Sequence, residues 1–325
     1  MQKTTLQKIE NPKVKTVAVL MGGWSNEHDV SMVSGGAVAK GLRNCGYSVQ
    51  EIVVGRDLDG LVRALSYKPD VVFNALHGVG GEDGRIQSVL DILGLKYTHS
   101  DHLASAIAMD KMKSKAIVAA RGVRIADGGV LPQQALKNTD NITLKPPFVI
   151  KPNQEGSSVG VYIIKEGDNR LEKIVADWNY GDALVEQYIK GRELTVSVMS
   201  MPYGHAKALT VTEITSDRGF YDYEAKYSDG GSVHVLPADI PEDIFKQAMK
   251  WAELSHIALG CGGITRTDFR YDDSQNGTDG LYYLETNTQP GMTPTSLVPE
   301  QAEYCGLPFN DLVQWMVESA YNEQE

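Results

Sequence analysis

Acidic, amide and guanidinium side chains alternate along two predicted strands near the end of the chain. Glu285 and Asn287 lie two positions apart after an apolar, aromatic stretch, and Arg266 and Asp268 lie two apart within 263–271. Because strand side chains alternate between the faces of a sheet, each pair is expected on one face. Two carboxylates, an amide and a guanidinium on one face would bind hard divalent cations and the anions that such cations carry.

The connection between the two strands predicts how they pair. It is polar and centred on Asn276-Gly277, a dipeptide favoured in tight hairpin turns. A turn centred there places Asp268 opposite Glu285 and Arg266 opposite Asn287. The four side chains are therefore expected to converge on one patch of the sheet.

The same alternation orients the rest of the second strand. Leu284 and Thr286 are expected to face away from the polar set. The stretch 288–297 then carries Gln-Pro-Gly and several Ser and Thr residues, where a backbone can bend sharply and present N–H groups. A solvated face with an incidental salt bridge is the alternative for any one residue, but the four together with this loop favour a site.

Lys151 ends an apolar strand, 147–152, and precedes a loop of small residues, 153–160. A lysine beside the N–H groups of small residues is suited to polyphosphate binding. The spacing is not Gly-x-x-x-x-Gly-Lys-Ser/Thr, so the loop is not a P-loop. The lysines of 109–115 are interpreted, by contrast, as the solvated face of a helix.

Two glycine-bearing turns follow predicted strands near the start of the chain, where α/β sheets place ligand sites. The first is not Gly-x-Gly-x-x-Gly, which argues against a dinucleotide-binding dehydrogenase. Glu27 lies at its strand-to-helix turn, where the helix dipole favours an anion able to bind ammonium; a capping acid is an equal alternative. His77 opens the second turn, which has four glycines in the eight residues 77–84, so its backbone is expected to approach another group closely. A structural histidine is the alternative, but the surrounding glycines favour a functional one.

Acids and tyrosines of the middle region suggest a nucleotide site and a lid. Glu186 closes one strand and Glu193 opens the next, so one could accept from an adenine amino group and the other from ribose hydroxyls; ordinary strand-end acids are the alternative. The segment 220–227, within the polar loop 216–232, holds three tyrosines and is predicted to close over a substrate and exclude water. A packing or oligomer contact is the alternative, and Lys226 would reach a γ-phosphate once the lid is closed.

Composition limits the class of protein. At 325 residues the chain suggests two or three domains, and 42% apolar residues is ordinary for a globular protein. A net charge of −11 argues against a general nucleic-acid binder and against binding to anionic membranes. Cys45, Cys261 and Cys305 are scattered, which favours reduced thiols over a disulfide framework or a zinc site. Without an apolar core typical of a signal peptide or a run of roughly 20 apolar residues, a cytoplasmic protein is expected.

The expected elements alternate strands and helices, which favours a parallel α/β unit at the start. Strands are expected at 14–20, 48–54, 70–76, 96–98, 147–152, 159–164, 183–188, 193–200 and 206–215, besides the hairpin. Helices are expected up to Asn44, at 58–65, 85–93, 104–120 and 241–259, and from Phe309 onward, with turns over 127–147.

Four motifs occur in order after residue 13: His77-Gly-x-x-Gly-Glu-Asp-Gly-x-Ile-Gln87, Lys151-Pro-x-x-Glu-Gly-Ser-Ser-Val-Gly160, Tyr221-Asp-Tyr-Glu-Ala-Lys-Tyr227, and Arg266-x-Asp268 followed by Glu285-x-Asn287-Thr-x-Pro-Gly-Met. Together they are far more specific than any one alone. In these motifs the chain resembles the bacterial D-alanine–D-alanine ligases of the ATP-grasp fold.

The resemblance implies an α/β (α+β) ATP-grasp fold with three domains. After a flexible tail at 1–13, it implies an N-terminal parallel α/β domain at 14–100. Two sheet-containing subdomains, a central one at 101–187 and a C-terminal one at 188–325, would grip ATP between them. The C-terminal subdomain would carry the lid loop and the metal site.

The resemblance also implies roles for the motif residues. Glu27 would hold the ammonium of the first D-alanine and be linked to Ser157 and Tyr227 by hydrogen bonds, with His77 near the reacting carboxylate. The remaining roles follow the motifs: Arg266 and the backbone of Gly291 for the tetrahedral intermediate; Ser296 and Leu297 for the carboxylate of the second D-alanine; Lys111, Lys151 and Lys226 for phosphates; Glu186 and Glu193 for adenosine; Asp268, Glu285 and Asn287 for two Mg²⁺ or Mn²⁺ ions, with K⁺ as a candidate further cation.

The implied activity is ATP-dependent ligation of two D-alanines through an acyl phosphate, for peptidoglycan precursor synthesis, by a cytoplasmic homodimer without nucleic-acid or membrane partners. The alternatives are a D-alanine–D-lactate ligase or another ATP-grasp carboxylate–amine ligase, and Tyr227 favours the amine acceptor over lactate. A nucleotide-binding regulator with a dead site is disfavoured because the motif lysines, acids and arginine are all present. An exported amino-acid-binding protein would need a signal. Gln187 departs from the lysine of many relatives, which affects only the adenine pocket.

Overall fold

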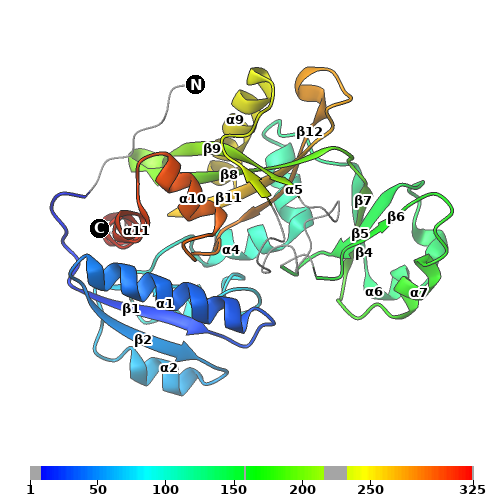
Figure 1. Ribbon diagram of the computed structural model, residues 1–325. Coiled ribbons are helices and arrows are strands. Elements are labelled where there is room, and N and C mark those ends of the chain that lie inside the picture. Colours follow the sequence, from blue (N-terminus) through cyan, green and yellow to red (C-terminus); the bar gives the residue numbers. More distant parts are fainter. Residues whose placement is uncertain (1–8, 157–158, 216–232, 324–325) are drawn as a thin grey trace.

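Three β-sheets organise the chain, and a computed structural model describes residues 9–156, 159–215 and 233–323 of it (Figure 1). A three-stranded sheet has the order β2-β1-β3, a four-stranded sheet the order β4-β7-β5-β6, and a five-stranded sheet the order β10-β9-β8-β11-β12. The expected mixture of a parallel α/β unit with two further sheets is confirmed. Ser157, Lys226, Tyr227 and the predicted lid 216–232 lie outside the described residues.

The N-terminal sheet is parallel; its strands β1 and β3 are apolar and almost fully buried, whereas the edge strand β2 buries only part of its side chains. Its elements are β1 (Thr16–Gly22), β2 (Ser48–Val54), β3 (Val71–Asn74), α1 (His28–Asn44), α2 (Leu58–Ala64) and α3 (Arg85–Ile92). One face packs on α1 and the other on α2 and α3. The strand expected at 96–98 is reduced to one bridge, between Tyr97 and Val72.

The single helix expected at 104–120 is two helices, α4 (His102–Met109) and α5 (Lys111–Ala119). Asp110 between them has φ −84° and ψ 98°, outside the helical region, and its side chain accepts from the backbone N–H of Lys113. Aspartate is a strong helix N-cap, and here it starts a new helix within an otherwise helical sequence. The break makes Lys111 the first residue of α5.

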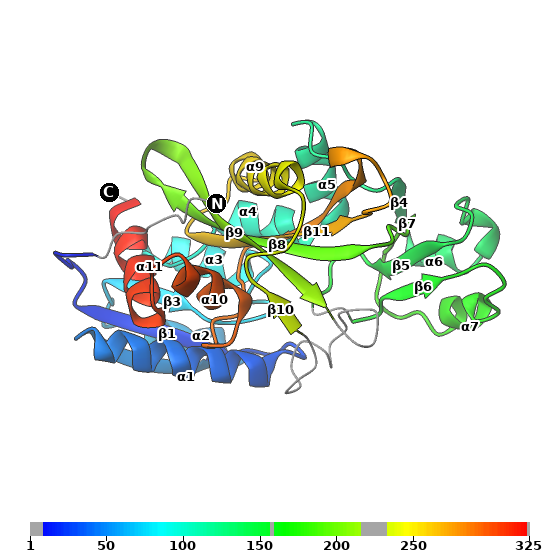
Figure 2. The same cartoon turned by 45° about the horizontal axis from the view of Figure 1, so that its top comes forward.

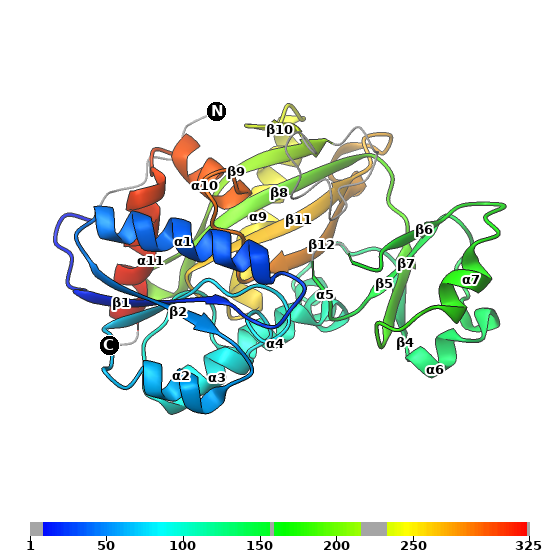
Figure 3. The ribbon, with the colours of Figure 1, turned by 60° about the horizontal axis from the view of Figure 1, so that its bottom comes forward.

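The four-stranded sheet is antiparallel and forms a separate lobe with its own small core (Figures 1 and 3). Its elements are β4 (Gly128–Leu131), α6 (Gln133–Leu136), β5 (Phe148–Pro152), β6 (Tyr162–Ile164), α7 (Leu171–Ala176) and β7 (Ala183–Gln187), with a 3-10 turn at Thr139–Asn141. Phe148 and Ile150 of β5 pack inward with Trp178. Residues 149 and 151 of β5 therefore face the opposite side. β4 lies in the stretch for which only turns were expected.

The five-stranded sheet is the centre of the molecule and lies between the other two (Figure 2). Its strands are β8 (Arg192–Met201), β9 (His205–Thr215), β10 (Val233–Val235), β11 (Ile264–Tyr271) and β12 (Leu281–Asn287), and its helices are α9 (Glu242–Ala258), α10 (Leu297–Tyr304) and α11 (Phe309–Glu323). α9 and α5 cover one face. Residues of α10 and α11 share a core with β1 and α1, which fixes this sheet to the N-terminal unit.

No helix in the described ranges is both long and apolar enough to cross a membrane.

His99 lies at the junction between the N-terminal unit and the central sheet in an unusual conformation. Its φ is 72°, in the left-handed region, and an added Cβ on Gly263, next to the start of β11, would lie 3.0 Å from its Cα. The ring packs edge-on against Phe73. Burial, assisted by the nearby His77, lowers the pKa of His99 to about 3.

The depressed pKa of His99 predicts an acid-sensitive stability. The unfolded chain takes up this proton below its ordinary pKa of about 6.5, whereas the folded chain does so only near pH 3. Unfolding is therefore favoured as pH falls through this window, by about 1.4 kcal/mol per pH unit from this one group. His99→Asn, which tolerates the left-handed backbone, removes this loss. Urea denaturation of both proteins from pH 7 to 4.5 measures how the free energy of unfolding changes with pH. An equal fall in both proteins would contradict the prediction.

Candidate active site

The predicted pairing of the polar strands is confirmed at the residues that matter. Across β11 and β12, Arg266 pairs with Asn287 and Asp268 with Glu285. Arg266 Nε and Nη2 donate to the two carboxylate oxygens of Asp268, each at 2.9 Å. On the other side, Thr195 of β8 donates to Asp268 Oδ1 at 2.6 Å. The carboxylate is therefore held by charge-assisted bonds from two strands.

A β-bulge interrupts this pairing beside the polar set. Phe269 pairs with Tyr283, whereas Asp268 pairs with Glu285, so Leu284 is the extra residue. Tyr283 points into the core beneath α9, while Glu285, two positions on, lines a cavity together with Leu284. A bulge redirects the side chains that follow it. The expectation that Leu284 faces away from Glu285 is therefore wrong, because strict alternation fails at this point.

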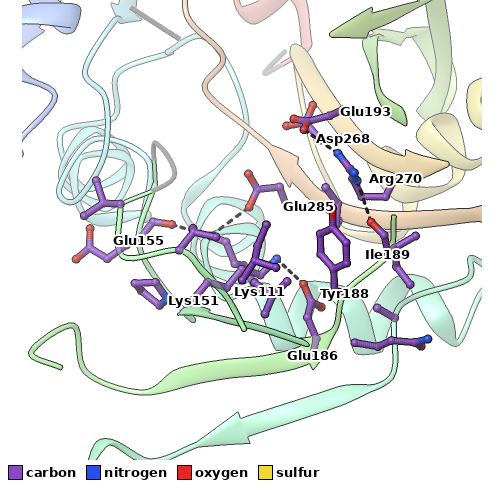
Figure 4. Close-up of a pocket in the computed structure, with 18 of the residues that line it drawn as sticks. Lys111, Lys151, Glu155, Glu186, Tyr188, Ile189, Glu193, Asp268, Arg270 and Glu285 are labelled. Atoms are coloured by element: carbon purple, nitrogen blue, oxygen red, sulfur yellow. Dashed lines mark hydrogen bonds and ion pairs between the residues drawn. The ribbon is translucent and has the colours of Figure 1, made fainter. Parts of the chain in front are cut away.

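A cavity of about 110 Å³ lies between the four-stranded and five-stranded sheets (Figure 4). Aliphatic side chains such as Val149, Ile163 and Ile189 form part of its wall. Six of the residues singled out in the sequence also line it: Lys111, Lys151, Glu186, Glu193, Asp268 and Glu285. The cavity thus brings together residues that lie far apart in the sequence: the lysines expected to bind phosphates, the acids expected to bind adenosine and the acids expected to bind metal ions.

The lysines and acids of this cavity form ion pairs across its walls (Figure 4). Lys111 Nζ lies 3.2 Å from Glu285 Oε2 and donates to the carbonyl oxygen of Glu155 at 2.6 Å. Lys151 Nζ lies 2.6 Å from Glu186 Oε1. Anionic phosphates would therefore meet two lysines whose charges are shared with cavity carboxylates.

Lys115 is a buried member of this network that the sequence interpretation missed. Its Nζ lies 2.8 Å from Glu186 Oε2 and donates to the carbonyl oxygen of Tyr283. Burial alone would raise the pKa of Glu186, but Lys115 and Lys151 outweigh it and lower that pKa to about 2. The reading of 109–115 as a solvated face holds for exposed Lys113 and is wrong for Lys115. The available signal was spacing, because positions 111 and 115 share one helix face.

Asp110 joins the two lysine-bearing segments. Asn153, just after β5, donates to Asp110 Oδ1 at 2.9 Å, and Gln154 donates to Oδ2. In return, the backbone N–H of Lys111 donates to the Asn153 carbonyl. Burial raises the pKa of Asp110, but bonds from Lys113, Asn153 and Gln154 lower it to about 2. The break between α4 and α5 thus fixes Lys111 relative to the strand that carries Lys151.

Glu27 and His77 lie near each other at the carboxyl ends of N-terminal strands. An added Cβ on Gly78 would lie 2.5 Å from Glu27 Oε2, and one on Gly156 would lie 3.2 Å from it. The close approach and the positive φ of +70° explain the glycine at position 78, whereas a side chain at position 156 would require only a small shift of the Glu27 carboxylate. His77 Nε2 contacts Ser34 Oγ at 3.1 Å, and Nδ1 lies 3.3 Å from Glu82. Glu27 is thereby placed between the glycine turn and the loop after Lys151.

The loop after β12 leads into a helix that was not expected from the sequence. Ser296 is the N-cap residue of α10, and Leu297 is its first residue. Ser296 Oγ accepts from the backbone N–H of Thr293 and would meet a Cβ on Gly291 at 3.1 Å. The start of a helix favours bound anions such as carboxylates. Ser34 Oγ accepts from Met292 N, which connects this loop to His77.

The polar set suits a divalent cation in its donor chemistry. Asp268, Glu285 and Asn287 present carboxylate and amide oxygens on two neighbouring strands, the donor type that Mg²⁺ prefers. In the described ranges no cluster of three or more His, Cys, Asp and Glu side chains could hold a metal. Any site here therefore relies on two carboxylates with an amide and a bound anion.

Comparison with known proteins identifies relatives over almost the whole chain. Residues 118–318 match a family model described as the C-terminus of D-Ala D-Ala ligase. A D-alanine–D-alanine ligase of Caulobacter vibrioides is 55% identical over 94% of this chain and 93% of its own length. One of Acidiphilium cryptum is 54% identical over 94% and 99%. The crystal structure of the Bacillus anthracis ligase complexed with ATP superposes with TM-score 0.79 and 31% identity, covering 96% of this chain and all of that one.

The buried ion pairs predict unequal roles for two lysines of α5. Lys115→Met is expected to lower the free energy of unfolding by about 3 kcal/mol, because loss of one buried partner leaves the Glu186 charge undercompensated. Lys113→Met on the same helix, where the side chain is exposed, should leave stability close to that of the parent. Denaturant unfolding at neutral pH compares the two, and equal midpoints would show that the Lys115 pair contributes nothing.

Proposed function

The chain belongs to the D-alanine–D-alanine ligase family, and we propose on this premise that it joins two D-alanines while ATP is converted to ADP and phosphate. The observation that carries the proposal is one cavity in which Lys111 and Lys151 meet the carboxylates of Asp268 and Glu285. This is the combination that phosphoryl transfer requires: cations for the phosphates and oxygen ligands for the accompanying metal.

We propose that ATP binds between the two sheets, with its phosphates toward Lys111 and Lys151 and its adenosine toward Glu186 and Glu193. All four line the cavity. Glu186 is already neutralised by two lysines, so its part is to hold Lys151 as well as to face the base. Lys226 of the predicted lid would add a third cation to the phosphates.

We assign two Mg²⁺ or Mn²⁺ ions to Asp268, Glu285 and Asn287, with K⁺ as a candidate further cation. The oxygen donors on the confirmed strand pairing support this assignment. When bound, the ions would neutralise charge on the transferring phosphoryl group. Lys111, which contacts Glu285, would then be released toward phosphate oxygens.

We propose that the first D-alanine binds with its ammonium on Glu27, supported by the glycines that crowd this carboxylate. Ser157 and Tyr227 complete this subsite, with His77 beside the reacting carboxylate. The second D-alanine places its carboxylate at Ser296 and Leu297, supported by their position at the start of α10.

The chemistry follows from these positions. A carboxylate oxygen of the first D-alanine attacks the γ-phosphorus, the bond to the β,γ-bridging oxygen breaks, and ADP leaves with that electron pair. The amine of the second D-alanine attacks the acyl carbon of the resulting acyl phosphate. Arg266 and the N–H of Gly291 stabilise the oxyanion, phosphate departs, and the amine proton is lost. A closed lid would keep water from the acyl phosphate.

The wider setting is also proposed. The boundaries 14–100, 101–187 and 188–325 are supported by the three sheets, which fall one within each range. A cytoplasmic location and a role in peptidoglycan precursor synthesis fit a ligase whose three cysteines are free thiols. A homodimer is proposed from the family resemblance alone.

Product analysis tests the proposal. Purified protein mixed with Mg²⁺, ATP and D-alanine is expected to release phosphate and D-alanyl-D-alanine in equal amounts, with none released when Mg²⁺ is omitted or L-alanine replaces D-alanine. Addition of D-lactate tests the ester-forming alternative, because Tyr227 predicts dipeptide rather than depsipeptide. ATP turnover that ignores D-alanine would refute the proposed function.

A further inference from the structure

The turn at 188–191 connects the two sheets that enclose the cavity. It runs from the end of β7 to the start of β8, and Tyr188 and Ile189 line the cavity (Figure 4). Gly191 has φ +97°, and an added Cβ would clash with the carbonyl oxygen of Tyr271. The turn therefore packs closely against the end of β11, and its conformation depends on the β11 groups that contact it.

Arg270 of β11 binds this turn at two points and Glu193, just after the turn, at a third. Its Nε donates to the carbonyl oxygen of Ile189 at 3.2 Å and its Nη2 to that of Gly191 at 2.8 Å. Its Nη1 lies 3.3 Å from Glu193 Oε2. Glu193 is its direct cross-strand partner on β8, where oppositely charged side chains attract. The planar guanidinium is suited to such a fork, which a lysine could not reproduce.

Arg270 also faces the cavity. It shares the sheet face of Arg266 and Asp268, since the three alternate along β11, and it lines the same cavity as Glu193. Both side chains of the pair are largely buried, with 13% and 16% of their surface exposed. Their attraction is therefore screened less by water than that of a surface pair.

We infer that Arg270 is a positioning residue for the nucleotide. By binding two carbonyls of the inter-sheet turn and one carboxylate oxygen of Glu193, it holds the turn against β11 and keeps Glu193 aimed into the cavity. Resting on the proposed function, this inference makes Glu193 the acceptor for the ribose hydroxyls and Arg270 the group that orients it. Arg270 contacts protein groups, and it affects nucleotide binding through the position of Glu193.

Arg192 provides a matched comparison one position from Glu193. It binds Glu213 with two donors and the carbonyl oxygen of Asp239. It is therefore also an arginine in an ion pair on the same sheet, but it does not line the cavity. If loss of either arginine weakened nucleotide binding only by destabilising the sheet, variants at Arg192 and Arg270 would both bind more weakly. If the effect is on nucleotide positioning, only the variant at Arg270 would.

Calorimetric binding of Mg²⁺-ATP and Mg²⁺-2′-deoxyATP to the whole protein tests this inference without requiring turnover. In the parent, Glu193 should favour ATP over the deoxynucleotide. Arg270→Met is expected to raise the Kd for ATP about tenfold, the effect of weakening one charge-assisted hydrogen bond, and to raise that for 2′-deoxyATP much less. The preference for the ribose hydroxyl should shrink, as it should in Glu193→Gln. Arg192→Met should keep the parental preference.

Arg270→Lys keeps the positive charge beside Glu193 but cannot bind both carbonyls. This variant should bind ATP more weakly than the parent while retaining part of the preference for ATP over 2′-deoxyATP. If Arg270→Met does not fold, Arg270→Lys still tests the inference. Parental affinity in Arg270→Met, or an equal loss for both nucleotides, would overturn the inference. A protein that binds ATP as expected but makes no dipeptide would overturn the proposed function while leaving the role of Arg270 intact.

Discussion

One extra residue in β12 determines which face of the sheet carries the Glu285 carboxylate. Tyr283 must remain in the core, where it packs with Phe269 beneath α9. In a regular strand Glu285 would follow it to that face, where an uncompensated carboxylate is costly. The bulge at Leu284 turns Glu285 into the cavity opposite Asp268 while the aromatic packing is kept. The polar site and the core thus share one hairpin without competing for the same face.

Charge balance is the second constraint on the cavity. Its lysines and carboxylates are already paired with one another: Glu186 with Lys115 and Lys151, Glu285 with Lys111, and Asp268 with Arg266. A bound triphosphate with metal ions would add both signs of charge, so these pairs would exchange partners without leaving an isolated buried charge. Lys115 stands apart because it is buried behind Glu186, away from the cavity lining. Lys115 holds Glu186, which in turn pairs with Lys151 in the cavity wall.

Much of the site was predictable from sequence, and the failures have physical causes. A turn centred on Asn276-Gly277 predicts the pairing of Asp268 with Glu285 correctly, but only because the bulge, which lies between the turn and that pair, shifts the register by one residue. The bulge itself was not predictable, since nothing in Tyr-Tyr-Leu-Glu shows which residue is extra. The helix break at Asp110 was missed because its capping bond competes with a strongly helical sequence, and its other partners, Asn153 and Gln154, lie far along the chain. α10 follows a proline- and threonine-rich loop that resembles a longer turn.

We propose that the redirected face of β12 carries the metal beside the nucleotide. Electron paramagnetic resonance of Mn²⁺ bound in the presence of ADP tests it most directly. The parent should bind two ions, whereas Glu285→Gln should lose at least one while keeping the parental unfolding midpoint. Asp279→Asn, an exposed acid in the turn of the same hairpin, should bind as the parent does. Two ions held with parental affinity by Glu285→Gln would contradict the assignment.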